Sequence, residues 1–127
     1  MKFTETKLQG CFILEPNVIR DERGYFMESI NDRTFKNDLE QAVHIVQDNQ
    51  SVSSRGVLRG LHYQTGEFAQ AKLVRVIQGE VLDVAVDIRP GSKTFGQYEA
   101  VVLSAENQKQ FFVPRGFAHG FLVLSET

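Results

Sequence analysis

The fold is decided by residues 57–64, which read VLRGLHYQ. The stretch fits a β-strand, in which successive side chains point to opposite faces. One face would carry Leu58, Gly60, His62 and Gln64, and the other would carry Val57, Arg59, Leu61 and Tyr63. A glycine beside an imidazole lets a ligand or another backbone come close. The stretch therefore predicts a strand that forms the floor of an active site.

The rest of the chain predicts an all-β fold. Strand patterns with Gly and Pro turns between them recur roughly every 8–12 residues, which is typical of a sandwich or barrel. They cover residues 12–16, 25–30, 43–50, 72–77, 81–88, 98–103, 110–113 and 120–124, with a turn at 21–24. The strands on either side of Gln78-Gly79-Glu80 predict the clearest hairpin. One short helix is expected near residues 32–40, capped by Asn31 or Asp32, in a single domain of residues 1–127.

Composition excludes several classes of protein. The net charge of −2 gives no general affinity for nucleic acid or for an anionic membrane. No apolar run reaches the roughly 18–20 residues that span a bilayer. The single cysteine, Cys11, cannot form an internal disulfide. We therefore expect a cytoplasmic protein that binds neither nucleic acid nor membranes.

His62 is the first candidate for chemistry. A histidine titrates near neutrality, which suits a general base, although a lone histidine in a strand is more often structural. Arg59 and Lys72 lie near it in the sequence, and cations beside a base indicate an anionic substrate. Arginine binds phosphate oxygens in bidentate fashion, whereas a lysine near a ketone stabilises an enolate oxygen. For each of these basic residues, and for Arg23, Arg75 and Arg115, a solvated surface charge is the simpler interpretation.

Two further segments carry polar groups. Gln47, Asp48 and Asn49 offer donors and acceptors that could read a pyrimidine edge, but Asp and Asn also favour turns, and both interpretations stay open. Residues 114–120, PRGFAHG, end in His119 and resemble the Pro-x-Gly-x-x-His motif of cupins. Metal-binding cupins carry a His-x-His pair in their other motif, whereas residues 62–64 here are His-Tyr-Gln. With only Glu67 as a further oxygen ligand, we expect no metal site.

Taken together, six segments resemble the dTDP-4-dehydrorhamnose 3,5-epimerases. They are DERGYFME at 21–28, QDNQS at 47–51, GVLRGLHYQ at 56–64, KLVRV at 72–76, DVAVDIR at 83–89 and VPRGFAHGF at 113–121. The resemblance covers nearly the whole chain. It implies a cupin-type jelly roll, usually a homodimer, without metal or organic cofactor. The implied reaction inverts C3 and C5 of dTDP-4-dehydro-6-deoxyglucose through protons α to the C4 ketone, which gives dTDP-4-dehydro-L-rhamnose.

The resemblance also implies roles for individual residues. His62 would be the general base, Lys72 would stabilise the enolate, and His119 would line the sugar pocket. Arg23 and Arg59 would hold the diphosphate. The remaining nucleotide contacts would be Phe26, Glu28, Gln47, Asp48 and Asn49. In a dimer of this family, Arg23 and Glu28 would serve the site of the partner chain.

One departure from the family concerns the C-terminus. Family members run on beyond the position of Thr127, through a tyrosine that acts as general acid and an aspartate that orients the base, so we expect a C-terminally shortened chain. Asp83 is the only nearby carboxylate that could take over the orientation of His62, and Tyr63 and Tyr98 are the available hydroxyls. Three functions stay open. They are the two-carbon epimerase, a one-carbon nucleotide-sugar epimerase or ketoisomerase, and a non-catalytic cupin that binds a dTDP-sugar.

Overall fold

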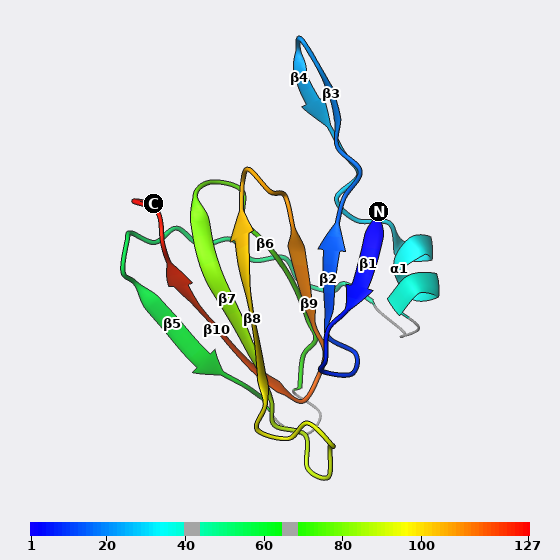
Figure 1. Cartoon of the computed structure of the whole chain (residues 1–127), viewed down its shortest axis with the longest axis vertical. Helices are drawn as coiled ribbons and strands as arrows, with labels where there is room; N and C mark the ends of the chain where they lie inside the picture. Colours follow the sequence, from blue (N-terminus) through cyan, green and yellow to red (C-terminus); the bar gives the residue numbers. More distant parts are fainter. Residues whose placement is uncertain (40–43, 65–68) are drawn as a thin grey trace.

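Two antiparallel sheets of four strands each face one another in a sandwich (Figure 1). The computed structural model describes residues 1–39, 44–64 and 69–127. The first sheet has the order β1 (Lys2–Glu5), β2 (Phe12–Glu15), β9 (Gln110–Val113) and β6 (Lys72–Arg75). The second has the order β5 (Leu58–His62), β10 (Phe117–Val123), β7 (Glu80–Asp87) and β8 (Tyr98–Ser104). The expected all-β fold with one short helix is confirmed.

The first sheet is covered on both faces. Every residue of its strand β9 is buried, and the alternation of side chains divides them between two clusters. Phe111 and Val113 point toward the second sheet and join the main core. Phe112 points outward and packs with Phe35 and Leu39 of the helix. The main core consists of Leu8, Cys11, Ala85, Val101, Leu103, Phe111, Val113 and Phe117.

The helix α1 (Asp32–Leu39) forms where its sequence predicts it. Asn31 caps its first turn, because the Asn31 Oδ1 atom accepts a hydrogen bond of 3.1 Å from the Thr34 backbone N–H. Phe35 and Leu39, four residues apart, form its one buried stripe. Residue 40, at the end of the predicted range, lies outside the described residues.

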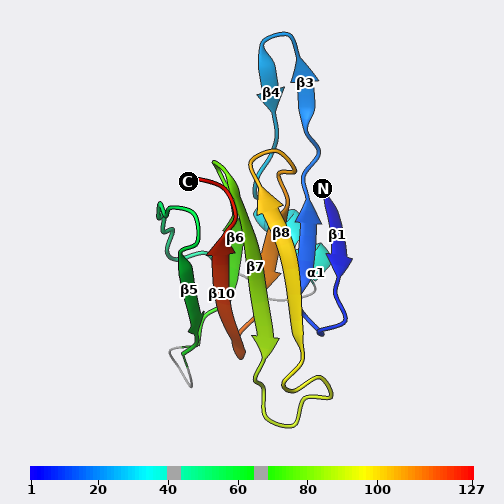
Figure 2. The ribbon, with the colours of Figure 1, turned by 60° about the vertical axis from the view of Figure 1, so that its left-hand side comes forward.

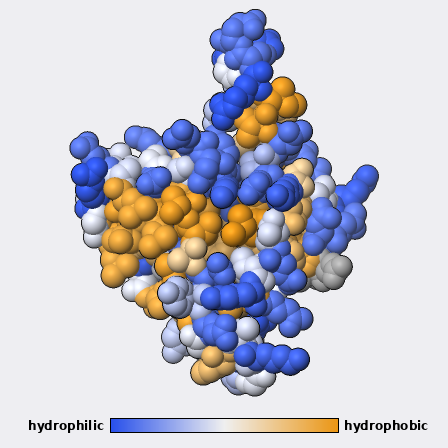
Figure 3. Space-filling view, viewed as in Figure 1, coloured by the Kyte–Doolittle hydropathy of each residue, from blue (hydrophilic) through white to orange (hydrophobic). Residues whose placement is uncertain are grey.

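The second sheet has two unlike faces. On β7, buried Asp83, Ala85 and Asp87 alternate with half-buried residues, so the inner face of this sheet carries two carboxylates. The outer face is apolar, with Leu58, Leu122, Leu82 and Val102 opposite one another across the four strands (Figure 3). An apolar face that is partly open to solvent is typical of a contact surface.

A two-stranded hairpin, β3 (Ile19–Asp21) and β4 (Gly24–Phe26), projects from one end of the sandwich. It extends away from the body in both views, and every residue of its strands is exposed (Figures 1 and 2). We call this hairpin the arm. The predicted turn at 21–24 is confirmed, and Asp21 Oδ1 accepts a bond of 2.8 Å from the Arg23 backbone N–H. The predicted strand at 25–30 is too long, since β4 ends at Phe26.

Two other predictions of strands are wrong. The expected hairpin around Gly79 does not form, because β6 pairs with β9 in one sheet and β7 pairs with β8 and β10 in the other. Val74 and Val81 face the same core from opposite sheets, which gives the same apolar pattern as a hairpin. Residues 44–50 form no strand, and Val46 is 82% exposed. Residue 43 lies outside the described residues.

Candidate functional site

Strand β5 does not keep the simple alternation that the sequence predicts. His62 lies opposite His119 of β10, whereas Arg59 lies opposite Phe121. Two residues of β5 therefore oppose one residue of β10, which is a β-bulge. Because directly opposed side chains share a face of a sheet, the bulge places Arg59 and His62 on the same, inner face. The prediction that these two residues point to opposite faces is wrong.

Two glycines permit this bulge. Gly60 has a φ of 118°, and a Cβ atom there would lie 2.6 Å from the Cα of Gly120. A Cβ atom on Gly120 would lie 2.7 Å from the carbonyl oxygen of Arg59. A larger residue at either position would push β5 and β10 apart. The close backbone approach expected beside His62 is confirmed.

His62 and Lys72 line one pocket of about 330 Å³. His62 ends β5 of the second sheet, and Lys72 begins β6 of the first, opposite Val113 of the core. The pocket therefore lies between the two sheets at their common end. Its other lining residues are Tyr63, Gln64, Gln70, Gly116 and Phe117. Gln70 was not predicted, because no motif distinguishes a loop glutamine. Phe117 lies inside the motif of residues 114–120, but the sequence assigned it no role.

His119 is buried and bound to Asp83. Its Nε2 atom lies 2.9 Å from each carboxylate oxygen of Asp83. Burial raises the pKa of Asp83, and the hydrogen bond and charge of His119, together with the charge of Lys72, oppose part of that rise. Asp83, the one carboxylate that the sequence offers as a substitute partner for His62, is directed to His119 instead.

The predicted nucleotide contacts on β5 and in the segment before it are exposed. Arg59 donates a hydrogen bond of 3.1 Å from Nε to the Ser53 hydroxyl. Gln47, Asp48 and Asn49 lie in an irregular segment, where the Gln47 amide donates to Asn49 Oδ1 at 3.3 Å. They form neither a strand end nor a turn, so the turn interpretation is wrong, and the contact with a pyrimidine edge stays a prediction.

Three other predicted site residues belong to the arm or its base. Arg23 forms a salt bridge of 2.7 Å with Asp21, and Phe26 is 70% exposed. Glu28, just after the arm, is also exposed. The arm leaves one end of the sandwich, whereas β5 runs away from that end toward His62 (Figure 1). The structure of one chain does not bring these residues to the pocket.

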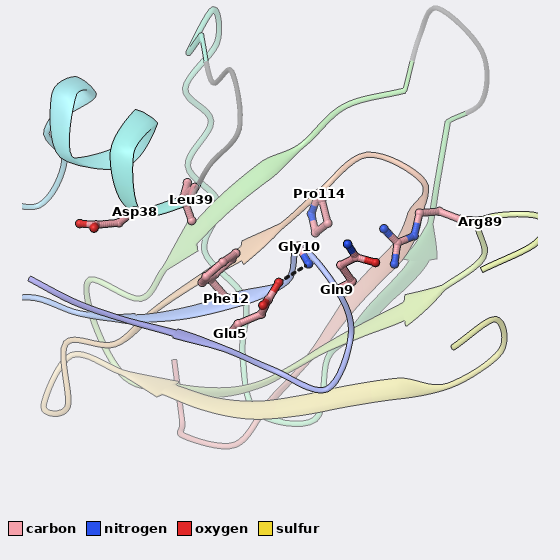
Figure 4. A pocket seen from close by; sticks show the side chains of 8 residues that line it. All are labelled: Glu5, Gln9, Gly10, Phe12, Asp38, Leu39, Arg89 and Pro114. Atoms are coloured by element: carbon pink, nitrogen blue, oxygen red, sulfur yellow. Dashed lines mark hydrogen bonds between the residues drawn. The ribbon is translucent and has the colours of Figure 1, made fainter. Parts of the chain in front are cut away.

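A larger pocket, of about 490 Å³, lies elsewhere on the chain (Figure 4). Its lining residues are Glu5, Gln9, Gly10, Phe12, Asp38, Leu39, Arg89 and Pro114. The side chain of Glu5 accepts a hydrogen bond of 2.9 Å from the Gly10 backbone N–H. Two carboxylates repel an anion, and the one guanidinium, of Arg89, is bound to Asp87. None of the site residues predicted from the sequence lines this pocket, which is poorly suited to a diphosphate.

Within residues 1–39, 44–64 and 69–127, no three His, Cys, Asp or Glu side chains lie close enough together to hold a metal ion. Glu67, the additional ligand considered from the sequence, lies outside these ranges. No helix in the described part of the chain has the length and apolar character needed to cross a bilayer.

Comparison with known proteins supports the resemblance noted above. The sequence profile of the dTDP-4-dehydrorhamnose 3,5-epimerase family matches residues 5–127. The chain is 58% identical over 126 residues to the dTDP-4-dehydrorhamnose 3,5-epimerase of Methanothermobacter thermautotrophicus, which covers 98% of this chain and 66% of the relative. The chain thus spans about two thirds of the length of that relative.

Solved structures show the same fold. The dTDP-6-deoxy-D-glucose-3,5-epimerase of Legionella pneumophila, in complex with dTDP-4-keto-L-rhamnose, is 52% identical with a TM-score of 0.94, over 98% of this chain and 66% of that one. The 3'-monoepimerase ChmJ of Streptomyces bikiniensis, in complex with dTDP-quinovose, is 35% identical with a TM-score of 0.89, over 95% and 61%. These matches confirm the expected cupin-type fold. By sequence and by structure, the chain belongs to the dTDP-4-dehydrorhamnose 3,5-epimerase family.

Proposed function

We propose that this chain acts on dTDP-4-dehydro-6-deoxyglucose and inverts C3 and C5, giving dTDP-4-dehydro-L-rhamnose. The observation that carries the proposal is that His62 and Lys72, from different sheets, line one pocket. Proton removal α to a ketone needs a base and a partner for the enolate oxygen, and an imidazole and an ammonium supply both. The names of the relatives give independent support.

In this mechanism, His62 removes the proton from C3 and later from C5. The Lys72 ammonium lies beside the C4 oxygen and stabilises the negative charge that each proton removal leaves there. Inversion also requires that a proton returns on the opposite face of the sugar ring. We assign no residue of the described chain to that step.

The bulge in β5 supports a diphosphate site beside the sugar. It places Arg59 on the same face of the sheet as His62, so that one ligand can reach both side chains. A guanidinium pairs with phosphate oxygens in bidentate fashion. Gln47, Asp48 and Asn49, which are exposed, would contact the base of the nucleotide, and His119 would line the sugar pocket from beside His62.

We propose a homodimer in which each arm completes the site of the partner chain. Arg23, Phe26 and Glu28 are exposed on or beside an arm that projects from its own chain, and two of them carry groups suited to phosphate or base contacts (Figure 2). The apolar outer face of the second sheet offers further contact surface.

A cytoplasmic location is part of the proposal. The single cysteine, Cys11, is free and lies in the main core. Burial raises its pKa to about 12, which keeps the thiol protonated and unreactive at neutral pH. A lone, inert thiol is typical of proteins from reducing compartments.

The second candidate function is the inversion of a single carbon, because ChmJ shares this fold and is a 3'-monoepimerase. A third, non-catalytic binding of a dTDP-sugar, needs the same nucleotide contacts without proton transfer. The keto sugar is incubated with the chain in deuterated water, and label at C3 and C5 is followed by NMR. We expect uptake at both carbons. Uptake at one carbon would indicate a monoepimerase, and none would contradict both enzymatic functions.

A further inference from the structure

Strand β7 carries two buried carboxylates, Asp83 and Asp87, four residues apart on the inner face of the second sheet. Both side chains are 0% exposed. A buried charge destabilises a fold unless hydrogen bonds and opposite charges compensate for the loss of water. Hydrogen bonds and charge compensate for the burial of Asp87 more fully than for the burial of Asp83. This difference points to a structural role for Asp87 and a functional role for Asp83.

Asp87 is fully compensated. Arg89 donates two side-chain hydrogen bonds of 3.0 Å to it, and the hydroxyls of Ser92 and Thr94 donate two more. Burial alone would raise the pKa of Asp87, but these bonds outweigh burial and hold the pKa below its usual range. All three partners lie within seven residues along the chain. Asp87 therefore holds the loop that follows β7 in place through hydrogen bonds and stabilises the fold.

Asp83 has no such local partners among the described contacts. Its carboxylate faces His119 of β10, and the positive charge of Lys72 of β6 acts on it from the other sheet. Burial dominates and raises its pKa, so the ionised form lowers the stability of the fold. Groups that are retained at a cost in stability are concentrated at functional sites.

The position of Asp83 connects it to the pocket. His119, which it binds, lies directly opposite His62, and side chains in that relation are in reach of each other. Lys72 is one of the residues that line the pocket. Asp83 thus contacts His119 and lies within the electrostatic reach of Lys72, but it does not line the pocket itself.

We propose that Asp83 is a positioning residue of the sugar pocket. It accepts the Nε2–H of His119, which fixes the tautomer and orientation of that imidazole beside His62, and it presents a negative charge toward the Lys72 ammonium. The proposal rests on the proposed function and extends it, because it names the group that holds the machinery of proton transfer in place.

The test compares Asp83→Asn with its matched control, Asp87→Asn. Asparagine keeps the shape of each side chain, removes the charge and replaces one accepting oxygen by an NH₂ donor. We expect Asp83→Asn to slow deuterium uptake by about 100-fold, the cost of a misplaced catalytic group, while the Kd for dTDP changes less than about threefold. Asp87→Asn should lower the melting temperature and leave uptake within about threefold of the parent chain. Uptake in Asp83→Asn within that same range would overturn the proposal.

A double-mutant cycle adds a readout that a purely structural role would not move. If Asp83 acts through His119, then Asp83→Asn in a His119→Gln background should slow uptake by less than about threefold, because the residues act as one unit. Additive effects of the two substitutions would overturn the proposal.

A second readout does not depend on catalysis. In ¹⁵N-resolved histidine spectra of the parent chain, we expect a protected Nε2–H signal from His119, which Asp83→Leu should abolish and Asp87→Asn should leave in place. If the parent chain takes up no deuterium, the proposed function fails, and this signal still tests the role of Asp83. A signal that survives in Asp83→Leu would overturn that role.

Discussion

The pocket and the arm are supported in different ways. The pocket is held by both sheets, by the bulge that turns Arg59 and His62 to one face, and by a buried pair behind it. The arm has two strands and no buried residue, and a lone two-stranded hairpin is marginally stable in water. Its salt bridge between Arg23 and Asp21 is exposed and contributes little. The groups proposed for proton transfer thus lie between the two sheets, whereas those proposed for the nucleotide on the arm have no core beneath them.

The largest effect on deuterium uptake is expected for His62, the proposed general base. His62→Asn keeps a polar side chain of similar size but removes the proton acceptor, so deuterium uptake should fall by about 10³-fold or more. The Kd for dTDP should stay within about threefold, because the nucleotide contacts are elsewhere. Uptake in this variant at a rate near that of the parent chain would show that His62 is not the base.

A substitution in the arm should weaken dTDP binding and leave deuterium uptake at saturating substrate nearly unchanged. Arg23→Ala removes a guanidinium assigned to the diphosphate, so the Kd for dTDP should rise about tenfold or more, while uptake at saturating substrate stays nearly unchanged. Glu22→Ala, a change at the neighbouring exposed position in the same turn, is the control and should leave the Kd unchanged. Equal affinities for both variants would remove the arm from the binding site.

A substitution at Gly120, in the bulge, should affect both deuterium uptake and dTDP binding. The Cβ of Gly120→Ala would overlap the carbonyl oxygen of Arg59 and separate β5 from β10. Because Arg59 and His62 move together, uptake should fall by about tenfold and dTDP binding should weaken as well. Gly96→Ala adds the same atom where nothing lies within 4 Å, at a φ of 83°, and controls for general destabilisation. Equal losses of uptake and dTDP binding in both variants would show that the bulge does not position Arg59 and His62.

The smallest effects concern stability and pH. Because the pKa of Asp87 is lowered, its stabilising contribution is present above the ordinary carboxyl pKa of about 4 and is lost as the pH falls through its folded value. Asp83 has a raised pKa, so its contribution is lost as the pH rises from about 4 through that raised value. Asp87→Asn should therefore lower the free energy of unfolding by about 1–3 kcal/mol at pH 7 and by less at pH 2. Melting curves should show Asp83→Asn gaining stability relative to the parent as the pH rises, and the reverse trend would contradict the assignment.

Much of the fold follows from local patterns. The strand at Gln110–Val113, the turn of the arm and the helix with its Asn31 cap are short-range features, which sequence rules can read. Residue types and the family resemblance also single out His62 and Lys72, which line one pocket, while their roles stay predictions.

The remaining features depend on contacts between distant segments. The bulge in β5 requires the register against β10, and Asp83 finds its partner 36 residues away. The strands on either side of Gly79 have the alternation of a hairpin whether they share a sheet or face each other across the core. Residues 44–50 have strand propensity but remain exposed, so propensity alone does not place them in a sheet.

The most direct test of the relation between pocket and arm mixes two inactive or weakened chains. His62→Asn and Arg23→Ala chains are unfolded together, refolded and assayed for deuterium uptake at a substrate concentration far below saturation. If each arm serves the pocket of its partner, half of the dimers carry one intact site, and uptake should recover to about a quarter of the parent rate. Uptake equal to the mean of the two variants measured separately would contradict this account.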